Sequence, residues 1–271
     1  MMKPKDYDQT MKIRWGQQIL EPKIDGIRAC YKNSEFISYN GKPIYNIQPI
    51  MQELRAVQMQ KGDFLDGELW SESGGWEKTM SIVKSSKTLK PIEDVKFYIF
   101  DYVLGQNADM TLLQRKRLID KLWDKQKHNW QHIQGVCWEI VESKKEFLSS
   151  YQIYQECGFE GIMIKNQDSP YHWMKRSKEW LRHKPTKTED VTIVGVKQGV
   201  GKYAQTLGSL VCVDQHGKNI CVSVGSDAER DKYWKRKKSL KGVVIEVKFF
   251  KRTANGTMYS AHLVREREDK C

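Results

Sequence analysis

The pattern of hydrophobic and polar residues predicts three amphipathic helices in the first two thirds of the chain. In each of them apolar residues recur every three or four positions and so share one helix face. These residues are Ile47, Ile50, Met51, Leu54 and Val57 in the first helix, Leu112, Ile119, Leu122 and Trp123 in the second, and Phe147, Tyr151 and Tyr154 in the third. The third helix also has terminal signals, because Ser143 and Glu146 form a capping-box pattern and Gly158 can end a helix.

Short apolar runs between these helices predict β-strands. The runs cover residues 63–70, 96–103 and 161–165. Strand and helix signals are therefore mixed over residues 1–184, which predicts one domain of the α+β class.

The pattern changes after Lys184. Residues 185–189 are polar and predict a hinge linker, whereas residues 190–271 carry mainly short strand signals. The strand candidates are 191–193, 210–214, 219–224 and 243–249, and one helix candidate covers 227–237. The pairs His216-Gly217 and Asn255-Gly256 can form the turns between neighbouring strands. This arrangement is typical of a small OB-fold β-barrel.

The charge of the chain points to its partner class. The formal net charge is +12 and the isoelectric point is near 9.3. A surplus of this size favours a polyanionic partner, of which nucleic acid is the commonest. The alternative is a basic surface that only maintains solubility.

Cysteine usage and the absence of long apolar runs indicate where the protein is found. The six cysteines are spread along the chain without a C-x-x-C pair, which favours reduced thiols over disulfides or a structural metal site. No apolar run is long enough for a signal peptide core or a membrane span. We therefore expect a soluble, cytoplasmic protein of a prokaryotic or phage-infected cell, with no membrane partner.

The sharpest chemical motif lies near the N-terminus. Lys23, Asp25, Gly26 and Arg28 form the pattern K-x-D-G-x-R, and Glu21 precedes it. By average residue usage such a match would arise by chance in about three of a thousand chains of this length. The alternative interpretation is a surface turn, because Asp-Gly is a favoured turn pair.

Four further blocks place charged residues on or beside strongly apolar strands. They are residues 65–69 (LDGEL), 97–101 (FYIFD), 159–165 (FEGIMIK) and 180–184 (WLRHK). Burying a charge is costly unless it has a partner, so these blocks together with the first motif predict one shared polar site. The alternative is a set of unrelated strand ends.

The residue types in these blocks suit nucleotidyl transfer. A lysine nucleophile must lose its proton, and only about one in a thousand ordinary lysines is neutral near pH 7.5. Arg28, Lys165, Lys184 or a metal ion could favour the neutral amine of Lys23. The carboxylates of Glu68 and Glu160 suit a sugar hydroxyl and a divalent metal. Lys165 and Lys184 can neutralise a phosphate, and Phe100 can stack on a base.

In order and spacing, the five blocks resemble the motifs shared by polynucleotide ligases and mRNA capping enzymes, the covalent nucleotidyltransferases. Near the C-terminus, Arg267, Asp269 and Lys270 resemble the R-x-D-K motif that closes the OB domain of DNA ligases. Over the whole chain the likeness is to minimal ATP-dependent DNA ligases of viruses and phages. With no domain expected before Lys23 and no zinc or helix-hairpin-helix region after the barrel, ATP is the expected donor.

This resemblance implies a role for each matching residue. Lys23 would attack the α-phosphate of ATP and carry AMP. Glu21 would contact the adenine edge, Phe100 and Met163 would contact its faces, and Arg28 and Glu68 would hold the ribose. Glu160 and Asp25 would bind the metal (Mg²⁺ or Mn²⁺). The phosphates would be bound by Lys165, Arg182 and Lys184, and the departing pyrophosphate would be oriented by Arg267, Asp269 and Lys270.

The implied substrate is nicked duplex DNA, bound by a monomer through phosphate contacts. The family usually has Arg after Ser in the strand that follows the nucleophile, but here Tyr39 follows Ser38. Recognition of the 5′-phosphate is therefore expected from Lys42, or from Lys175 and Arg176. Other candidate DNA contacts are Lys197, Lys202, Lys87, Lys90 and residues 235–238.

Two rival functions remain open at this point. An RNA ligase or a capping guanylyltransferase would use the same first domain, although the R-x-D-K ending and the short all-β second domain favour a DNA ligase. A non-catalytic protein that binds single strands through its OB barrel would not need the complete set of Lys23, Glu68, Glu160 and Lys184.

Overall fold

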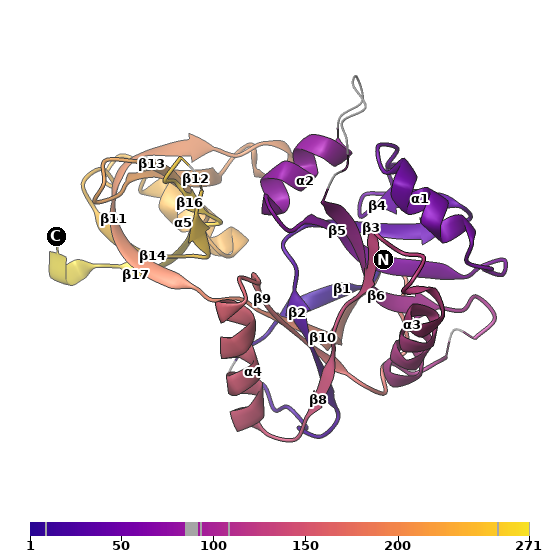
Figure 1. Cartoon of the computed structure of the whole chain (residues 1–271). Helices are drawn as coiled ribbons and strands as arrows, with labels where there is room; N and C mark the ends of the chain where they lie inside the picture. Colours follow the sequence, from indigo (N-terminus) through magenta and orange to yellow (C-terminus); the bar gives the residue numbers. More distant parts are fainter. Residues whose placement is uncertain (9, 85–91, 93, 108, 254, 271) are drawn as a thin grey trace. The chain divides into compact units, whose positions relative to one another are not determined.

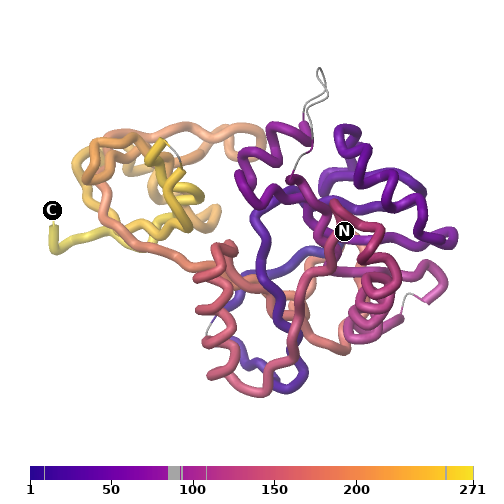
Figure 2. The backbone as a smooth tube through the Cα atoms, viewed as in Figure 1, coloured from indigo at the N-terminus to yellow at the C-terminus, as the bar shows by residue number. Residues whose placement is uncertain are grey.

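The computed structural model describes residues 1–271 apart from 9, 85–91, 93, 108, 254 and 271. The chain divides into two compact units, Met1–His183 and Lys184–Cys271 (Figures 1 and 2). Within the described ranges, no helix has the length and apolar character needed to cross a membrane.

The first sheet of the first unit carries Lys23, the first residue of the N-terminal motif. Its strands, in spatial order, are β1 (Lys3–Asp6), β10 (Arg176–His183), β9 (Gly161–Asn166), β2 (Gln18–Lys23) and β8 (Glu139–Val141). All neighbours are antiparallel except β1 and β10, which run parallel. Helix α4 (Lys144–Glu156) buries Phe147 in a cluster with Leu20 and Ile162, so the central strands have an apolar face.

The second sheet of this unit carries most of the hydrophobic core. Its spatial order is β4 (Glu35–Ser38), β3 (Ile27–Lys32), β5 (Phe64–Ser71), β6 (Val95–Val103) and β7 (Ile133–Gly135). Helices α1 (Gln48–Arg55), α2 (Gly75–Val83) and α3 (Leu112–Gln126) contribute Leu54, Ile82 and Ile119 to its core. The mixture of helices with two sheets confirms the predicted α+β class.

All three predicted helices are present as α1, α3 and α4. The hydroxyl of Ser143 accepts the backbone N–H of Glu146 as predicted, but the Glu146 carboxylate binds the backbone N–H of Glu142 instead of completing the capping box. Gly158 follows α4 with a φ of +82°, which favours glycine. The pattern did not reveal α2, because it begins at Gly74-Gly75 without a side-chain cap.

The second unit is an antiparallel sheet with one α-helix among its described residues. Its spatial order is β13 (Asn219–Val222), β12 (Leu207–Val213), β11 (Lys187–Gln198), β14 (Val244–Phe249) and β17 (His262–Glu266). A bridge between Ser223 and His262 connects the two outer strands, so the sheet closes on itself in a manner consistent with an OB fold. Helix α5 (Asp227–Lys235) contributes Tyr233 to the core.

Short elements complete the second unit. They are β15 (Lys251–Arg252), β16 (Met258–Tyr259) and the 3₁₀ turns η1 (Gly201–Tyr203) and η2 (Glu268–Lys270). β15 and β16 pair across the turn predicted at Asn255-Gly256, where Gly256 has a φ of +79°.

The predicted linker at 185–189 is shorter in the structure. Lys187, Thr188 and Glu189 belong to β11 and pair with β14. The Glu189 carboxylate also accepts a hydrogen bond from Arg252 at 2.6 Å. A polar segment suggests a loop when its strand partner lies far along the chain, as it does here. Of the predicted linker, only residues 185 and 186 lie outside the strands.

Candidate active site

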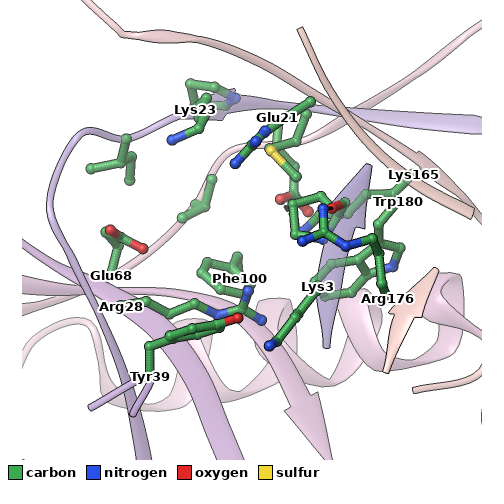
Figure 3. A pocket seen from close by; sticks show the side chains of 16 residues that line it. Lys3, Glu21, Lys23, Arg28, Tyr39, Glu68, Phe100, Lys165, Arg176 and Trp180 are labelled. Atoms are coloured by element: carbon green, nitrogen blue, oxygen red, sulfur yellow. Dashed lines mark hydrogen bonds and ion pairs between the residues drawn. The ribbon is translucent and has the colours of Figure 1, made fainter. Parts of the chain in front are cut away.

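Both sheets of the first unit contribute to a cavity of about 260 Å³ (Figure 3). Members of all five sequence blocks line it, namely Glu21, Lys23, Arg28, Glu68, Phe100, Met163, Lys165, Trp180 and Arg182. They come from β2, β3, β5, β6, β9 and β10. Residues up to 161 positions apart in sequence (21 to 182) thus share one polar site.

Lys23 is the last residue of β2, and its ammonium forms an ion pair with Glu160. The turn that follows fits closely against β5. A Cβ at Gly26 would lie only 2.2 Å from the carbonyl oxygen of Leu69 and 2.9 Å from the side chain of Glu68. The glycine of the motif is therefore required by close packing, and it brings the Lys23 turn against the strand that carries Glu68.

Glu21 is buried between two lysines. It pairs with Lys116 of α3 and accepts a hydrogen bond from Lys165 at 2.5 Å. Burial opposes its ionisation, but the charges of Lys116 and Lys165 outweigh this effect and lower the pKa of Glu21. Burial also lowers the pKa of Lys165 to about 8, against the pull of Glu21.

The arrangement around Glu21 differs from the expected roles. Lys165 was expected at the phosphates, but its ammonium is buried, bound to Glu21 and 4.1 Å from the ring centre of Trp180. Glu21 was expected at an adenine edge, and its carboxylate is already held by two cations. The sequence could not show which groups pair, because Lys116 and Lys165 lie on elements far from Glu21 along the chain.

Arg28 is fixed by Asp66, a residue of the LDGEL block to which the sequence assigned no role. The guanidinium donates two hydrogen bonds to the Asp66 carboxylate, at 3.1 and 2.7 Å. The hydroxyl of Tyr171 donates a third at 2.5 Å. Burial works against the charge on Arg28, but Asp66 outweighs it and raises the pKa of the guanidinium. Arg28 therefore stays charged, with its guanidinium 5.1 Å from the ring centre of Phe100.

Glu68 on β5 is the carboxylate of the cavity that has no close partner. It is half-buried, and none of the described residues donates a hydrogen bond to it. Burial raises its pKa to about 7, although the charges of Lys23 and Arg28 partly counteract this. A half-buried carboxylate without a partner is suited to accept hydrogen bonds from a ligand.

Phe100 and Met163 reach the cavity from different sheets. Phe100 lies on β6, and Met163 lies on β9 opposite Glu21 of β2. Two cations lie near the Phe100 ring: the Arg28 guanidinium and the Lys165 ammonium, which is 4.6 Å from the ring centre. Two apolar groups on separate sheets can enclose a flat ring between them.

The remaining catalytic candidates are divided between the two units. Arg182 lines the cavity and binds Asp6 at 2.5 Å. Lys184 belongs to the second unit, where its ammonium lies 4.8 Å from the ring centre of Phe250. In the same unit, Arg267 binds Asp190 and Asp269, and Lys270 donates to Asp190 at 2.7 Å.

The DNA-binding candidates are divided between the two units. Lys42, Lys175 and Arg176 belong to the first unit, whereas Lys197 and Lys202 belong to the second. Of these lysines, Lys202 pairs with Asp227 at 3.6 Å. Lys87 and Lys90 lie outside the described residues.

Besides Asp66, the polar residues of the site that the sequence did not assign include Lys116, Lys3 and Tyr39. Lys116 had a detectable signal, because it lies between Leu112 and Ile119 on the apolar face of α3, where a lysine needs a buried partner. Lys3 and Tyr39 also line the cavity. Tyr39 stands where the family usually has Arg but had been given no role, and Lys3 had no local signal that set it apart from a surface residue.

Comparison with known proteins agrees with this geometry. Residues 2–184 match the family model described as "ATP dependent DNA ligase domain".

The chain belongs to the ATP-dependent DNA ligase family.

Curated relatives of this family include two DNA ligases. "DNA ligase 2" of Methanosarcina acetivorans is 27% identical over 231 residues, which cover 77% of this chain and 40% of that protein. "DNA ligase" of Haemophilus influenzae is 24% identical over 201 residues, which cover 74% of this chain and 70% of that protein. The chain thus spans less than half of the archaeal relative's length.

Solved structures of the family share the fold. The structure titled "Pmar-Lig_PreS3" is 26% identical with a TM-score of 0.84, over 98% of this chain and 67% of that chain. A structure from a study of Lig E DNA ligases that bind DNA "with a minimal scaffold" is 23% identical with a TM-score of 0.81, over 98% of both chains. The second likeness extends across both units and supports the OB-like fold of the second.

Proposed function

We propose that this chain is an ATP-dependent DNA ligase that seals nicks in duplex DNA through an AMP group carried on Lys23. The observation that carries the proposal is the cavity itself. It combines the Lys23 amine with the unpartnered carboxylate of Glu68, the fixed cation of Arg28 and the ring of Phe100. Lysine, cations and an aromatic wall are the parts needed to hold and transfer a nucleotide.

The first step is self-adenylation. The neutral amine of Lys23 attacks the α-phosphorus of ATP, the nitrogen–phosphorus bond forms, and the bond to the bridging oxygen breaks so that pyrophosphate leaves. Lys23 must first leave its ion pair with Glu160 and lose a proton. Such chemistry depends mainly on positioning and charge stabilisation.

Glu160 and Asp25 are the residues that would hold a divalent cation. Among the described residues no group of three or more His, Cys, Asp or Glu side chains forms a metal cage. Two carboxylates nevertheless fit Mg²⁺, which is commonly bound by one or two carboxylates together with substrate phosphates. When bound, the cation would neutralise phosphate charge. Glu160 would then release Lys23 and bind the cation instead.

The rest of the nucleotide follows from the walls of the cavity. Phe100 and Met163 would enclose the adenine, and Glu68 would accept a hydrogen bond from the ribose. Lys184, Asp269 and Lys270 belong to the second unit, so their proposed phosphate roles require that unit to close on the nucleotide. AMP would then pass to the 5′-phosphate of a nick, and the 3′-hydroxyl would displace it.

Incubation with α-labelled ATP and Mg²⁺ tests the first step. We expect the label to become attached to the protein, to be lost completely in Lys23→Ala, and to be retained in Lys5→Ala, a lysine of β1 that does not line the cavity. Absence of label from the wild-type protein would contradict the proposal and favour a nucleic-acid-binding protein.

A substrate panel tests the second half of the reaction. Nicked DNA should be sealed faster than nicked RNA or hybrid duplexes, and ATP should be preferred to GTP as the donor. Faster sealing of RNA, or label transfer from GTP, would instead indicate an RNA ligase or a capping-type enzyme.

A further inference from the structure

Two cations at the rim of the cavity have no role in the formation of the lysyl adenylate, and only one of them, Arg176, was a candidate for the 5′-phosphate from the sequence. Lys3 of β1 and Arg176 of β10 are direct partners in the register of these parallel strands, and both line the cavity. The Lys3 ammonium lies 4.8 Å from the ring centre of Tyr39 (Figure 3). Tyr39 follows β4, so the second sheet supports a cation that comes from the first sheet.

Neither cation is neutralised by a carboxylate in the part of the chain that the structure describes. The hydrogen bond recorded for the Arg176 guanidinium goes to the backbone carbonyl of Pro4, at 3.1 Å, and Lys3 has the Tyr39 ring. Like charges on directly opposed residues of neighbouring strands repel each other. A bound anion would remove this repulsion, so the pair is suited to hold one.

The position of Lys3 is fixed by the residues before it. Met1 and Met2 are 2% and 0% exposed and lie in the core cluster that contains Tyr171 and Trp180. The backbone N–H of Met2 also donates to the hydroxyl of Tyr171 at 3.0 Å. Because the chain is anchored immediately before Lys3, its side chain reaches the cavity from a rigid base.

A second cavity, of about 920 Å³, indicates where the anion comes from. Arg28 and Tyr39 line both cavities, so the second begins where the first ends. The second is lined by Lys42 and Lys84 and by the exposed aromatic side chain of Tyr45, which is 72% exposed. Lysines beside exposed aromatic rings are suited to a nucleic-acid strand.

We propose that Lys3 and Arg176, with Lys3 held over Tyr39, bind the 5′-phosphate of the nick and hold it beside the AMP carried on Lys23. The assignment rests on the proposed ligase function. The alternative is that Lys3 and Arg176 bind the β- and γ-phosphates of ATP, which carry the same kind of negative charge. Tyr39, which holds Lys3, also lines the lysine-lined second cavity, and this connection favours the DNA phosphate.

The decisive experiment measures how strongly the protein distinguishes a 5′-phosphate from a 5′-hydroxyl at a nick. It is done in the Lys23→Ala background, where no transfer can occur, with two nicked duplexes that differ only in this group. We expect the 5′-phosphate duplex to bind more tightly, and we expect Lys3→Ala to reduce the ratio of the two affinities by about 10-fold or more, as for loss of a charged hydrogen bond. Lys5→Ala should leave the ratio unchanged.

Further variants separate a phosphate-binding role from a structural one. Lys3→Arg and Tyr39→Phe keep the cation and the ring and should retain most of the discrimination, whereas Tyr39→Leu should lose part of it. Removing Lys3 also removes a repulsion, so Lys3→Ala should not lower the melting temperature. A large fall in melting temperature with unchanged discrimination would show that Lys3 is only structural.

A comparison of self-adenylation with AMP transfer distinguishes the DNA phosphate from the phosphates of ATP. In the otherwise wild-type protein, Lys3→Ala should slow transfer of AMP to a 5′-phosphate nick at least 10-fold more than it slows formation of the lysyl adenylate. Equal slowing of both steps would assign the pair to the phosphates of ATP and overturn the proposal. If the wild-type protein takes up no label, the proposed function fails, but the binding ratio can still be read.

Discussion

Glu21 and Glu68 lie in the same cavity but in opposite electrostatic situations. Glu21, on β2, is held between the ammonium groups of Lys116 and Lys165, and its pKa is lowered. Glu68, on β5, has no hydrogen-bond donor among the described residues, and its pKa is raised to about 7. The two carboxylates belong to different sheets.

This difference separates a residue that builds the site from one that is left for the ligand. A buried carboxylate held by two cations costs much to disturb, because removing it leaves buried charges without a partner. A half-buried carboxylate without a hydrogen-bond donor costs stability in the free protein, and a ligand hydroxyl can recover that cost. Three substitutions test the contrast, in order of their expected effect on stability.

Glu21→Gln should have the largest effect. It leaves Lys116 and Lys165 buried without their carboxylate, so we expect the free energy of unfolding to fall by about 3–5 kcal/mol, as for other broken buried ion pairs. Chemical denaturation measures this loss. The double variant Glu21→Gln/Lys165→Met should recover part of it. A loss below 1 kcal/mol would show that the buried cluster contributes little.

Glu68→Gln should have a smaller effect of opposite sign. The raised pKa means that the folded protein retains this proton between pH 4.5 and about 7 while the unfolded chain releases it. Glu68 therefore costs increasing stability as the pH rises through this window, and no more above it. Glutamine removes the cost, so the melting temperature should rise by roughly 2–4 °C at pH 8 and by less at pH 5.

The functional consequence of Glu68→Gln should be a loss. We expect self-adenylation to fall about 10- to 100-fold, because a neutral amide replaces a charged acceptor for the ribose. Thermal melting at the two pH values measures the change in stability, and label uptake measures the loss of self-adenylation. A melting temperature that falls at pH 8 would mean that Glu68 is a structural residue like Glu21.

Lys270→Ala should have the smallest effect on stability. Asp190 also accepts two cations, Arg267 and Lys270, but the Lys270 side chain is 50% exposed. Water screens such pairs, so the free energy of unfolding should change by less than about 0.5 kcal/mol. The variant should still impair self-adenylation while sealing a pre-adenylated nick. Equal loss in both assays would contradict the role assigned to the terminal motif.

The predicted elements succeeded where the signal is local. Helices α3 and α4 follow from apolar spacing, and the start of α4 follows from Ser143 at its N-terminal cap, signals that involve residues within a few positions of one another. Strand β1 could not be predicted, because its partner β10 is more than 170 residues away and its own sequence, KPKD, is polar. The same limit hid the start of β11 at Lys187.

The sequence by itself determined the chemistry available to this protein: the motif around Lys23, the acids and cations of the four later blocks and the glycine at position 26. Only the tertiary structure decided how these charges are paired. Lys165 reaches Glu21 rather than open solvent, Arg28 reaches Asp66, and Lys3 reaches Tyr39. The reason is physical, because pairing and burial depend on neighbours from distant strands, and these set the charge of each group.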